Sequence, residues 1–314
     1  MNGDAGPPTK PAADAIFMAT NNAAGSDSGS GRVTFLDGRG DLPMIEITTP
    51  WSSAEIYLHG AHVTHFKKHD EPPLLFLSQC SRFEKDAPIR GGIPVIFPWF
   101  GKPADKPGQH GFARVKDWEL KEIHSPADGS VKVRLRLAAW AELAAGKITV
   151  DYLVNVNTEL TAELVVRNGS LQPFVFENCL HTYFTVGDIN AVSVQGLQGV
   201  DYLNQPTNFS RHTDSDREIR FTAEVDRAYL NTNHAVEIHD ASLQRVIRVE
   251  KAGSLSTVVW NPWIAKAKAM PDYGDEEYRE MVCVESGNVA ENKISLAPGE
   301  TSRLKVKLSS AGKS

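Results

Sequence analysis

The chain has 314 residues, of which 41% are hydrophobic and 23% are charged, so it can bury a sizeable core in one large domain or two average ones. Its formal net charge of −6 argues against general binding to nucleic acid or to a membrane surface, because such binding needs an excess of Lys and Arg. No apolar run has the length needed to cross a bilayer. We therefore expect a soluble protein in which any anionic ligand meets a local positive site.

Residues 1–31 are rich in Ala, Gly, Ser, Asn and Pro, and this composition predicts a flexible N-terminal tail. A transit peptide is the alternative interpretation. Such peptides avoid acidic residues, whereas this stretch contains Asp4, Asp14 and Asp27. The stretch also lacks the hydrophobic core of a secretory signal.

From Val33 onward, hydrophobic residues recur with a period of two, which is typical of half-buried strands. The pattern predicts strands at 45–48, 55–58, 131–137, 147–156, 161–168, 191–197, 236–239, 246–250 and 304–308. Helical patterns are few and short, at 138–145, 263–270 and 275–281. Strands do not alternate with helices, so we predict an all-β fold, a large antiparallel β-sandwich with a few short helices. It should form one domain over 32–309, followed by a short C-terminal tail at 310–314.

The three cysteines, Cys80, Cys179 and Cys283, are odd in number and lie in strand-like or apolar surroundings. This pattern argues against a disulfide framework and favours a reducing compartment. Together with the absence of a signal sequence, it predicts a cytoplasmic protein.

Four histidines lie close together in the sequence at His59, His62, His65 and His69. Imidazoles are common metal ligands, but on a strand His62 points to the opposite face from His59 and His65, and no cysteine lies nearby to complete a tetrahedral set. We therefore predict packing or surface histidines and no metal site. Whether the cluster has a function stays open at this point.

Two glycine-containing segments each carry an arginine. Arg90 precedes Gly91 and Gly92, which let the backbone bend and come close to a ligand. For Arg90 alone, a structural salt bridge is the simpler interpretation. Arg114 ends a second such segment, in which Gln109 and its neighbour His110 can bind sugar hydroxyls. The pair of guanidiniums favours an anion site for a carboxylate or a phosphate.

Two further residues can move protons. His181 lies in an apolar segment, where a single histidine is usually a satisfied core residue. Glu285 follows Met281–Val284, which should form a buried strand, and a carboxylate at its end needs a partner because burying an unpaired charge is costly. Burial also raises a carboxyl pKa toward the working range of a general base. We expect the two residues to share one site, because curved β-sheets bring together side chains from distant strands.

Six short strings carry a resemblance to a known family, in this order along the chain: GAHVT (60–64), IRGGIP (89–94), QHGFAR (109–114), LHTYF (180–184), VWNPW (259–263) and CVE (283–285). Together they resemble the glucose-6-phosphate 1-epimerases, or hexose-6-phosphate mutarotases, of the aldose 1-epimerase superfamily. The resemblance spans about residues 33–308 and does not cover the N-terminal tail.

The resemblance implies a galactose-mutarotase-like β-supersandwich that interconverts the α and β anomers of hexose 6-phosphates without a metal or organic cofactor. It places the family's catalytic residues on His181 and Glu285. It places the substrate-binding residues on Arg90, Gln109, Arg114 and Asp226, of which Asp226 is the loosest match. One departure is Ser286, which follows the glutamate where many relatives have Pro or Ala.

These observations lead to one hypothesis and two alternatives. In the hypothesis, Glu285 takes the proton of the C1 hydroxyl and His181 protonates the ring oxygen of a hexose 6-phosphate. The alternatives are an epimerase for unphosphorylated hexoses and a sugar-binding protein without turnover, since a fold does not fix a function. We expect a monomer whose partner is a small molecule, with neither nucleic acid nor membrane as partner. The sequence does not choose between glucose, galactose and mannose 6-phosphate.

Overall fold

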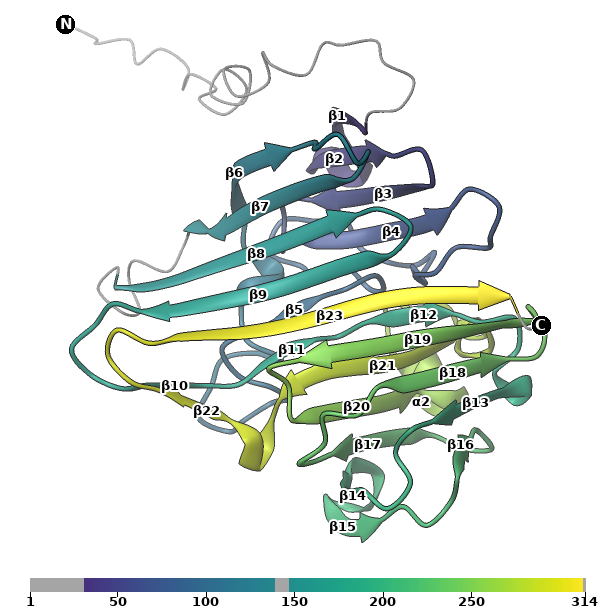
Figure 1. The fold of residues 1–314 in the computed structure, drawn as a ribbon. Coiled ribbons are helices and arrows are strands. Elements are labelled where there is room, and N and C mark those ends of the chain that lie inside the picture. The colour runs from purple at the N-terminus through teal and green to yellow at the C-terminus, as the bar shows by residue number, and fades with distance from the viewer. Residues whose placement is uncertain (1–30, 139–146, 313–314) are drawn as a thin grey trace, which may run out of the picture.

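The computed structural model describes residues 31–138 and 147–312 (Figure 1). Residues 1–30 of the expected tail and most of the expected helix at 138–145 lie outside the described residues. At the other end of the chain, the last strand continues to Gly312, so the expected boundary after residue 309 falls inside a strand. Within the described residues, no helix combines the length and the apolar character that a bilayer crossing requires.

A nine-stranded antiparallel sheet forms one layer of the sandwich. Its strands are, in spatial order, β16 (Glu218–Arg220), β13 (Val192–Gln195), β18 (Val236–Asp240), β19 (Arg245–Ala252), β23 (Thr301–Gly312), β9 (Leu160–Asn168), β8 (Ile148–Val156), β7 (Val131–Leu137) and β6 (Trp118–His124). The expected alternation is clear in β7, where every second residue is buried. One face of this sheet therefore packs on the core and the other faces solvent.

The second layer contains an eight-stranded and a four-stranded sheet. The eight-stranded sheet consists of β15 (Ser210–Thr213), β14 (Asp201–Asn204), β17 (Val225–Tyr229), β20 (Ser256–Asn261), β21 (Met281–Asn288), β11 (Asn178–Leu180) and β5 (Val95–Ile96), with β12 (Tyr183–Thr185) also paired to β21. The four-stranded sheet consists of β1 (Arg32–Asp37), β2 (Pro43–Thr48), β3 (Ser52–Tyr57) and β4 (His62–Lys68). A small ribbon pairs β10 (Phe174–Phe176) with β22 (Ile294–Leu296).

The nine-stranded sheet contacts both other sheets, through β3 with β8 and through β11 and β21 with β23 (Figure 1). The main core fills the space between these layers. The prediction of a large antiparallel β-sandwich is therefore confirmed. Helices are few and short, as expected: α2 (Trp263–Ala269) and the 3-10 turns η1 (Arg39–Asp41), η2 (Ala113–Val115), η4 (Ile189–Ala191), η5 (Gln205–Thr207), η6 (Glu277–Glu280) and η7 (Ala290–Asn292).

Strand β21 departs from the alternating pattern, because all eight of its residues are buried, as are all six residues of the neighbouring β20. It lies inside the eight-stranded sheet, with β20 on one side and β11 and β12 on the other. A strand covered on both faces normally reads as a continuous apolar run. Glu285, in the middle of β21, therefore stands out as a buried ionisable group.

Candidate active site

A row of side chains crosses the eight-stranded sheet next to Glu285. Cys283 lies opposite Trp260 of β20 on one side and opposite Tyr183 of β12 on the other, and Asp226 of β17 lies opposite Trp260. Directly opposed residues share a face of a sheet, and so do residues two apart on one strand. Glu285 therefore projects from the same face as Cys283, and it is only 1% exposed.

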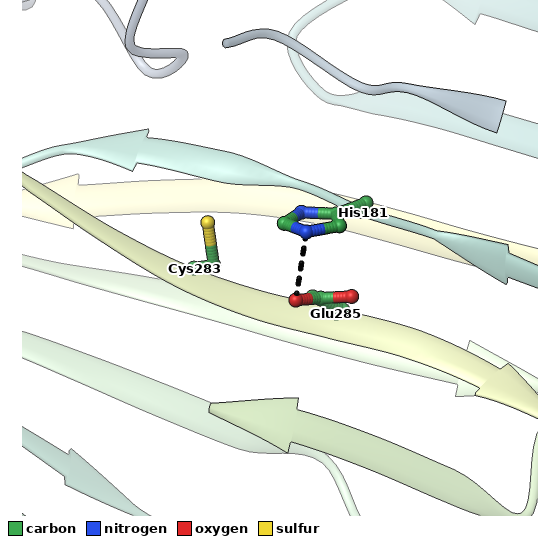
Figure 2. Close-up of side chains that lie close together, drawn as sticks. All are labelled: His181, Cys283 and Glu285. Atoms are coloured by element: carbon green, nitrogen blue, oxygen red, sulfur yellow. Dashed lines mark ion pairs between the residues drawn. The ribbon is translucent and has the colours of Figure 1, made fainter. Parts of the chain in front are cut away.

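His181 lies in the short connection between β11 and β12, where its backbone N–H donates to the carbonyl of Pro94. Its ring stacks on Tyr183, with 4.8 Å between ring centroids and 12° between planes, and meets Trp260 edge to face. Its Nε2 atom lies 3.2 Å from Oε1 of Glu285 (Figure 2). His181 is 7% exposed, so the pair is almost fully removed from water.

Burial changes the protonation of this pair. Burial, followed by the positive charges of Arg114 and Arg90, holds the pKa of His181 well below its usual range. Burial, followed by the charge of Asp226, raises the pKa of Glu285 well above its usual range. Both shifts favour the uncharged forms, and the pair then holds one proton between Nε2 and Oε1.

Two thiols flank Glu285. The Sγ atom of Cys179 donates a 3.4 Å hydrogen bond to Oε2 of Glu285. Burial, followed by the nearby Glu285, raises the pKa of Cys179 and of Cys283 well above the usual range. Cys179, Cys283 and the exposed Cys80 are all free thiols.

Arg90 reaches the same cluster but has a carboxylate partner. Its Nε and Nη2 atoms donate to both oxygens of Asp272 at 3.1–3.2 Å, and its Nη1 donates to the hydroxyl of Tyr183 at 3.1 Å. Burial alone would lower the pKa of Arg90, but Tyr183 and Asp272 outweigh burial and raise it. The salt bridge considered for Arg90 is thus present, and its hydrogen bond to Tyr183 connects it to the ring on which His181 stacks.

The bend at Arg90 depends on the glycines and on one of the clustered histidines. Gly92 has φ of +60°, and a Cβ atom there would lie 2.2 Å from the carbonyl oxygen of Val63. The fully buried His62 bonds through Nε2 to the carbonyl of Gly91 at 2.7 Å. Burial lowers the pKa of His62 to about 3, so it donates as a neutral imidazole. His62 is therefore a structural support for the Arg90 segment.

The other three clustered histidines bond to separate groups. His59 bonds to the carbonyl of Ala87, His69 to that of Thr49, and His65 to the hydroxyl of Ser53. The one group of potential metal ligands in the described residues does not include any of them.

The second arginine segment lies beside His181. Gly111 has φ of +66°, and a Cβ atom there would lie 2.0 Å from the carbonyl oxygen of Phe97, so only glycine fits this close approach. Arg114 donates from Nη2 to the carbonyl of Gln109 at 2.7 Å, and within the described residues its buried Nε has no acceptor. Burial, followed by the charge of Arg90, lowers the pKa of Arg114 to about 10.

His110 joins this segment to the catalytic candidates. Its Nδ1 accepts a hydrogen bond from the backbone N–H of Gly101 at 3.1 Å, and its Nε2 lies 3.0 Å from Nε2 of the exposed Gln109. The His110 ring meets His181 edge to face at 5.7 Å. Burial, followed by Arg114, lowers the pKa of His110 well below its usual range.

Asp226 approaches from β17, and its carboxylate lies 3.4 Å from Nζ of Lys266. Burial raises the pKa of Asp226 to about 6, although Lys266 acts in the opposite direction. Its charge in turn contributes to the raised pKa of Glu285. Asp226 can therefore carry or lose a proton near neutral pH.

The structure thus brings all six of the predicted site residues into one cluster. The sequence analysis missed three parts of it: Asp272, the ring of Tyr183, and the thiols of Cys179 and Cys283. A signal existed for the thiols and for Tyr183, because each lies two residues from His181 or Glu285 and a strand repeats its face every second residue. No signal existed for Asp272, which reaches Arg90 from 182 residues away.

Two hollows in the described surface lie elsewhere. One is lined by β6 to β9 and β23, and the other by the segment from Asp214 to Thr222 and by Arg227. Neither is lined by any of the six predicted site residues. The buried cluster around Glu285 is therefore the candidate active site on the basis of its chemistry.

Comparison with known proteins shows the family of the chain. A family model described as Aldose 1-epimerase matches residues 43–309. The chain belongs to the aldose 1-epimerase family. A protein of Cenchrus ciliaris named "Putative glucose-6-phosphate 1-epimerase" is 38% identical over 267 residues, which are 82% of this chain and 80% of that protein. A protein of Escherichia coli K12 with the same name is 34% identical over 262 residues, 81% of this chain and 85% of that protein.

Solved structures confirm the expected fold. The crystal structure of a "putative mutarotase (YeaD)" from Salmonella typhimurium matches with a TM-score of 0.82 and 31% identity, covering 89% of this chain and 94% of that one. A galactose mutarotase-like protein from Clostridium acetobutylicum matches with a TM-score of 0.64 and 15% identity, covering 90% of this chain and 98% of that one. The second match shows the fold alone, which is the supersandwich that the resemblance implies.

Proposed function

We propose that this chain is an isomerase that interconverts the α and β anomers of a hexose 6-phosphate, with glucose 6-phosphate as the first substrate to test. One observation carries the proposal: a buried imidazole and a buried carboxylate lie 3.2 Å apart beside two guanidiniums. The name of the two relatives points to the same substrate.

The reaction needs two proton transfers at neighbouring oxygens. Glu285 removes the proton of the C1 hydroxyl while His181 delivers one to the ring oxygen, and the bond between C1 and that oxygen breaks to leave an aldehyde. Both oxygens are bonded to C1, so their two proton carriers must also be close to each other. The 3.2 Å between Nε2 and Oε1 meets this requirement.

The pair needs only one proton for a full cycle. The proton moves from Oε1 of Glu285 to Nε2 of His181 when substrate binds, which leaves the carboxylate free to act as the base. After ring opening Glu285 holds a proton and His181 is neutral again. The open sugar turns about its C1–C2 bond and closes again with the two roles reversed, which gives the other anomer. Neither oxidation nor group transfer occurs, so the protein has only to position the sugar and move protons.

Arg114 and Arg90 would hold the 6-phosphate, with Arg114 as the main contact. Asp272 already offsets the charge of Arg90 and occupies most of its donors. Among the described residues, Arg114 bonds only to a neutral carbonyl and keeps a buried donor without an acceptor. A guanidinium with unused donors is suited to bind a phosphate through paired hydrogen bonds.

Gln109 and Asp226 would contact sugar hydroxyls from opposite ends of the cluster. Gln109 is exposed at its edge, and Asp226 has a carboxyl that can accept from or donate to a hydroxyl near neutral pH. All of these groups belong to one chain, so a monomer would be sufficient for activity.

A coupled mutarotation assay tests the proposal by comparing glucose 6-phosphate with free glucose. We expect faster anomerisation of the 6-phosphate, measured as kcat/KM. Equal rates on both sugars would favour an epimerase for neutral hexoses. Binding of glucose 6-phosphate without any acceleration would favour a sugar-binding protein.

A further inference from the structure

We propose that His181, Cys283 and Glu285 form a binding site for a soft or borderline divalent cation, with Zn²⁺ as the best match, and that the bound ion inhibits the enzyme. One potential ligand atom from each residue lies within 4.8 Å of the other two, and all three residues are buried. Figure 2 shows the thiol of Cys283 and the carboxylate of Glu285 on the same side of β21, with the His181 ring beside them.

The ligand types select the ion. An imidazole, a thiolate and a carboxylate are the three side chains that bind Zn²⁺ in proteins, and sites with three protein ligands keep a fourth position open for water or another ligand. Hard cations such as Mg²⁺ and Ca²⁺ prefer all-oxygen sets. A sulfur ligand therefore favours Zn²⁺, Cd²⁺ or Co²⁺, and the Cys283 thiol gives up its proton to water when it binds the ion.

The spacing also suits a tetrahedral site. With metal–ligand distances of about 2.0–2.2 Å, a ring nitrogen and a carboxylate oxygen on one tetrahedral ion lie about 3.4 Å apart. His181 Nε2 and Glu285 Oε1 lie 3.2 Å apart, so this edge exists already. With a metal–sulfur distance of about 2.3 Å, the edges to sulfur would measure about 3.6 Å. The sulfur therefore has to approach by at most about 1.2 Å, which requires a rotation of the Cys283 side chain.

The backbone holds the three ligands in place. Cys283 and Glu285 alternate on β21, which pairs with both β20 and β12, so their common direction is fixed by the sheet. His181 is fixed by its backbone bond to Pro94 and by stacking on Tyr183. In the described part of the chain, no other three His, Cys, Asp or Glu side chains bring their ligand atoms this close together.

The inhibition follows from the proposed function and rests on it. A bound ion takes the lone pair of the imidazole and that of the carboxylate, which are the two groups that exchange protons with the sugar. Cys283 has no part in those transfers. Replacing its sulfur therefore separates ion binding from catalysis.

The test measures ion binding and activity separately in wild type, Cys283→Ser and Cys80→Ser. Cys80 is an exposed thiol, so Cys80→Ser is the matched control. Zn²⁺ affinity comes from calorimetry on the metal-free protein, and Co²⁺ serves as a second probe, because a cobalt–thiolate bond gives a charge-transfer absorption. Inhibition comes from the glucose 6-phosphate mutarotation assay over a series of Zn²⁺ concentrations.

We expect wild type and Cys80→Ser to bind Zn²⁺, to show the thiolate band with Co²⁺ and to lose activity in parallel with binding. Losing even an outer-shell partner of a metal ligand typically costs about 10- to 100-fold in affinity, so Cys283→Ser should lose more than about tenfold. It should also lose the cobalt–thiolate band and keep most of its activity in Zn²⁺. If Cys283→Ser does not fold, Cys283→Ala supplies the same comparison.

Three results would overturn the proposal: no Zn²⁺ binding by wild type, a thiolate band that survives in the Cys283 variant, or Zn²⁺ binding at full affinity without loss of activity. An inactive protein that still binds Zn²⁺ through Cys283 would instead reject the proposed function and leave the metal site standing. The two proposals therefore fail separately.

Discussion

Asp151 and Glu285 are buried carboxylates in different layers of the sandwich, and their surroundings are opposite. Asp151 of β8, in the nine-stranded sheet, is 2% exposed. Arg136 donates to both of its oxygens at 2.7 and 3.0 Å, and Arg167 donates to one at 2.9 Å. Burial would raise the pKa of Asp151, but the two guanidiniums outweigh it and lower the pKa.

Glu285 of β21, in the eight-stranded sheet, has an imidazole and a thiol as its partners, and its pKa is raised. Guanidiniums do not give up protons, so Asp151 stays ionised in a fixed structural pair. The partners of Glu285 can exchange protons. The comparison teaches that the type of partner, and not burial itself, separates a structural carboxylate from a reactive one.

The largest expected effect is on the rate, from removing either member of the reactive pair. Glu285→Gln and His181→Asn should each lower kcat for glucose 6-phosphate by about 10²- to 10⁴-fold, the usual contribution of one proton-transfer group. Both substitutions nearly preserve shape, so circular dichroism and Tm should stay close to wild type. Asp151→Asn makes a similar neutralisation in the other sheet and should keep the wild-type rate. Wild-type kcat in both site variants would reject the assignment.

The next largest effect is on the preference for phosphorylated sugar. Arg114→Ala should lower kcat/KM for glucose 6-phosphate by about 10- to 100-fold, because a hydrogen bond to a charged group contributes about 1.5–3 kcal/mol. The rate on free glucose should change little. Arg90→Ala should cost less in phosphate preference than Arg114→Ala but more in stability, since it leaves Asp272 buried without its partner. A larger loss of phosphate preference in Arg90→Ala than in Arg114→Ala would contradict our ranking of the two.

A smaller effect, on stability alone, is expected in the structural pair. Asp151→Asn should lower the free energy of unfolding by about 2 kcal/mol, because charge-assisted bonds from two arginines are weakened. Both guanidiniums are partly exposed and can rehydrate, which limits the loss. Urea unfolding at neutral pH measures the change. Unchanged unfolding free energy together with a lowered kcat would reverse the roles that we assign to the two carboxylates.

Sequence reasoning predicted the regular parts of the fold well. The expected strand at 131–137 coincides with β7, because alternation there is complete from Val131 to Leu137. It also predicted that Glu285 would be buried and need a partner, because the residues before it are apolar. The short strands β5, β11 and β12, which position His181, have only two or three residues each and show no usable period.

The contacts around Arg90 could not be predicted either. Its pairing with Asp272 joins two irregular loops, and only the folded chain brings them together. The support that His62 gives to the carbonyl of Gly91 is of the same kind. Such contacts depend on where loops cross, and neither hydrophobic period nor residue spacing encodes that.

Lys251 of β19 is a third kind of ion, half-buried and without a counter-charge. Its ammonium donates to the carbonyl of Ser256 and to the hydroxyl of Thr257, at 2.9 and 2.7 Å. No carboxylate pairs with it within the described residues. Burial lowers its pKa to about 7, whereas the unfolded chain should keep the ordinary value of about 10.4.

This difference predicts that stability depends on pH. Between about pH 7 and pH 10 the unfolded state binds more protons at Lys251 than the folded state does, so stability should rise with pH across that window. Lys251→Met removes this contribution, and its unfolding free energy should rise less than that of wild type between pH 7 and pH 9. Lys305→Met, on the neighbouring strand β23, removes an exposed lysine and is the matched control. Urea unfolding measures how the unfolding free energy of each variant changes with pH. If Lys251→Met and Lys305→Met showed the same change, the pKa of Lys251 would not be lowered in the folded state. The carbonyl of Ser256 and the hydroxyl of Thr257 would then stabilise its charge as well as water does.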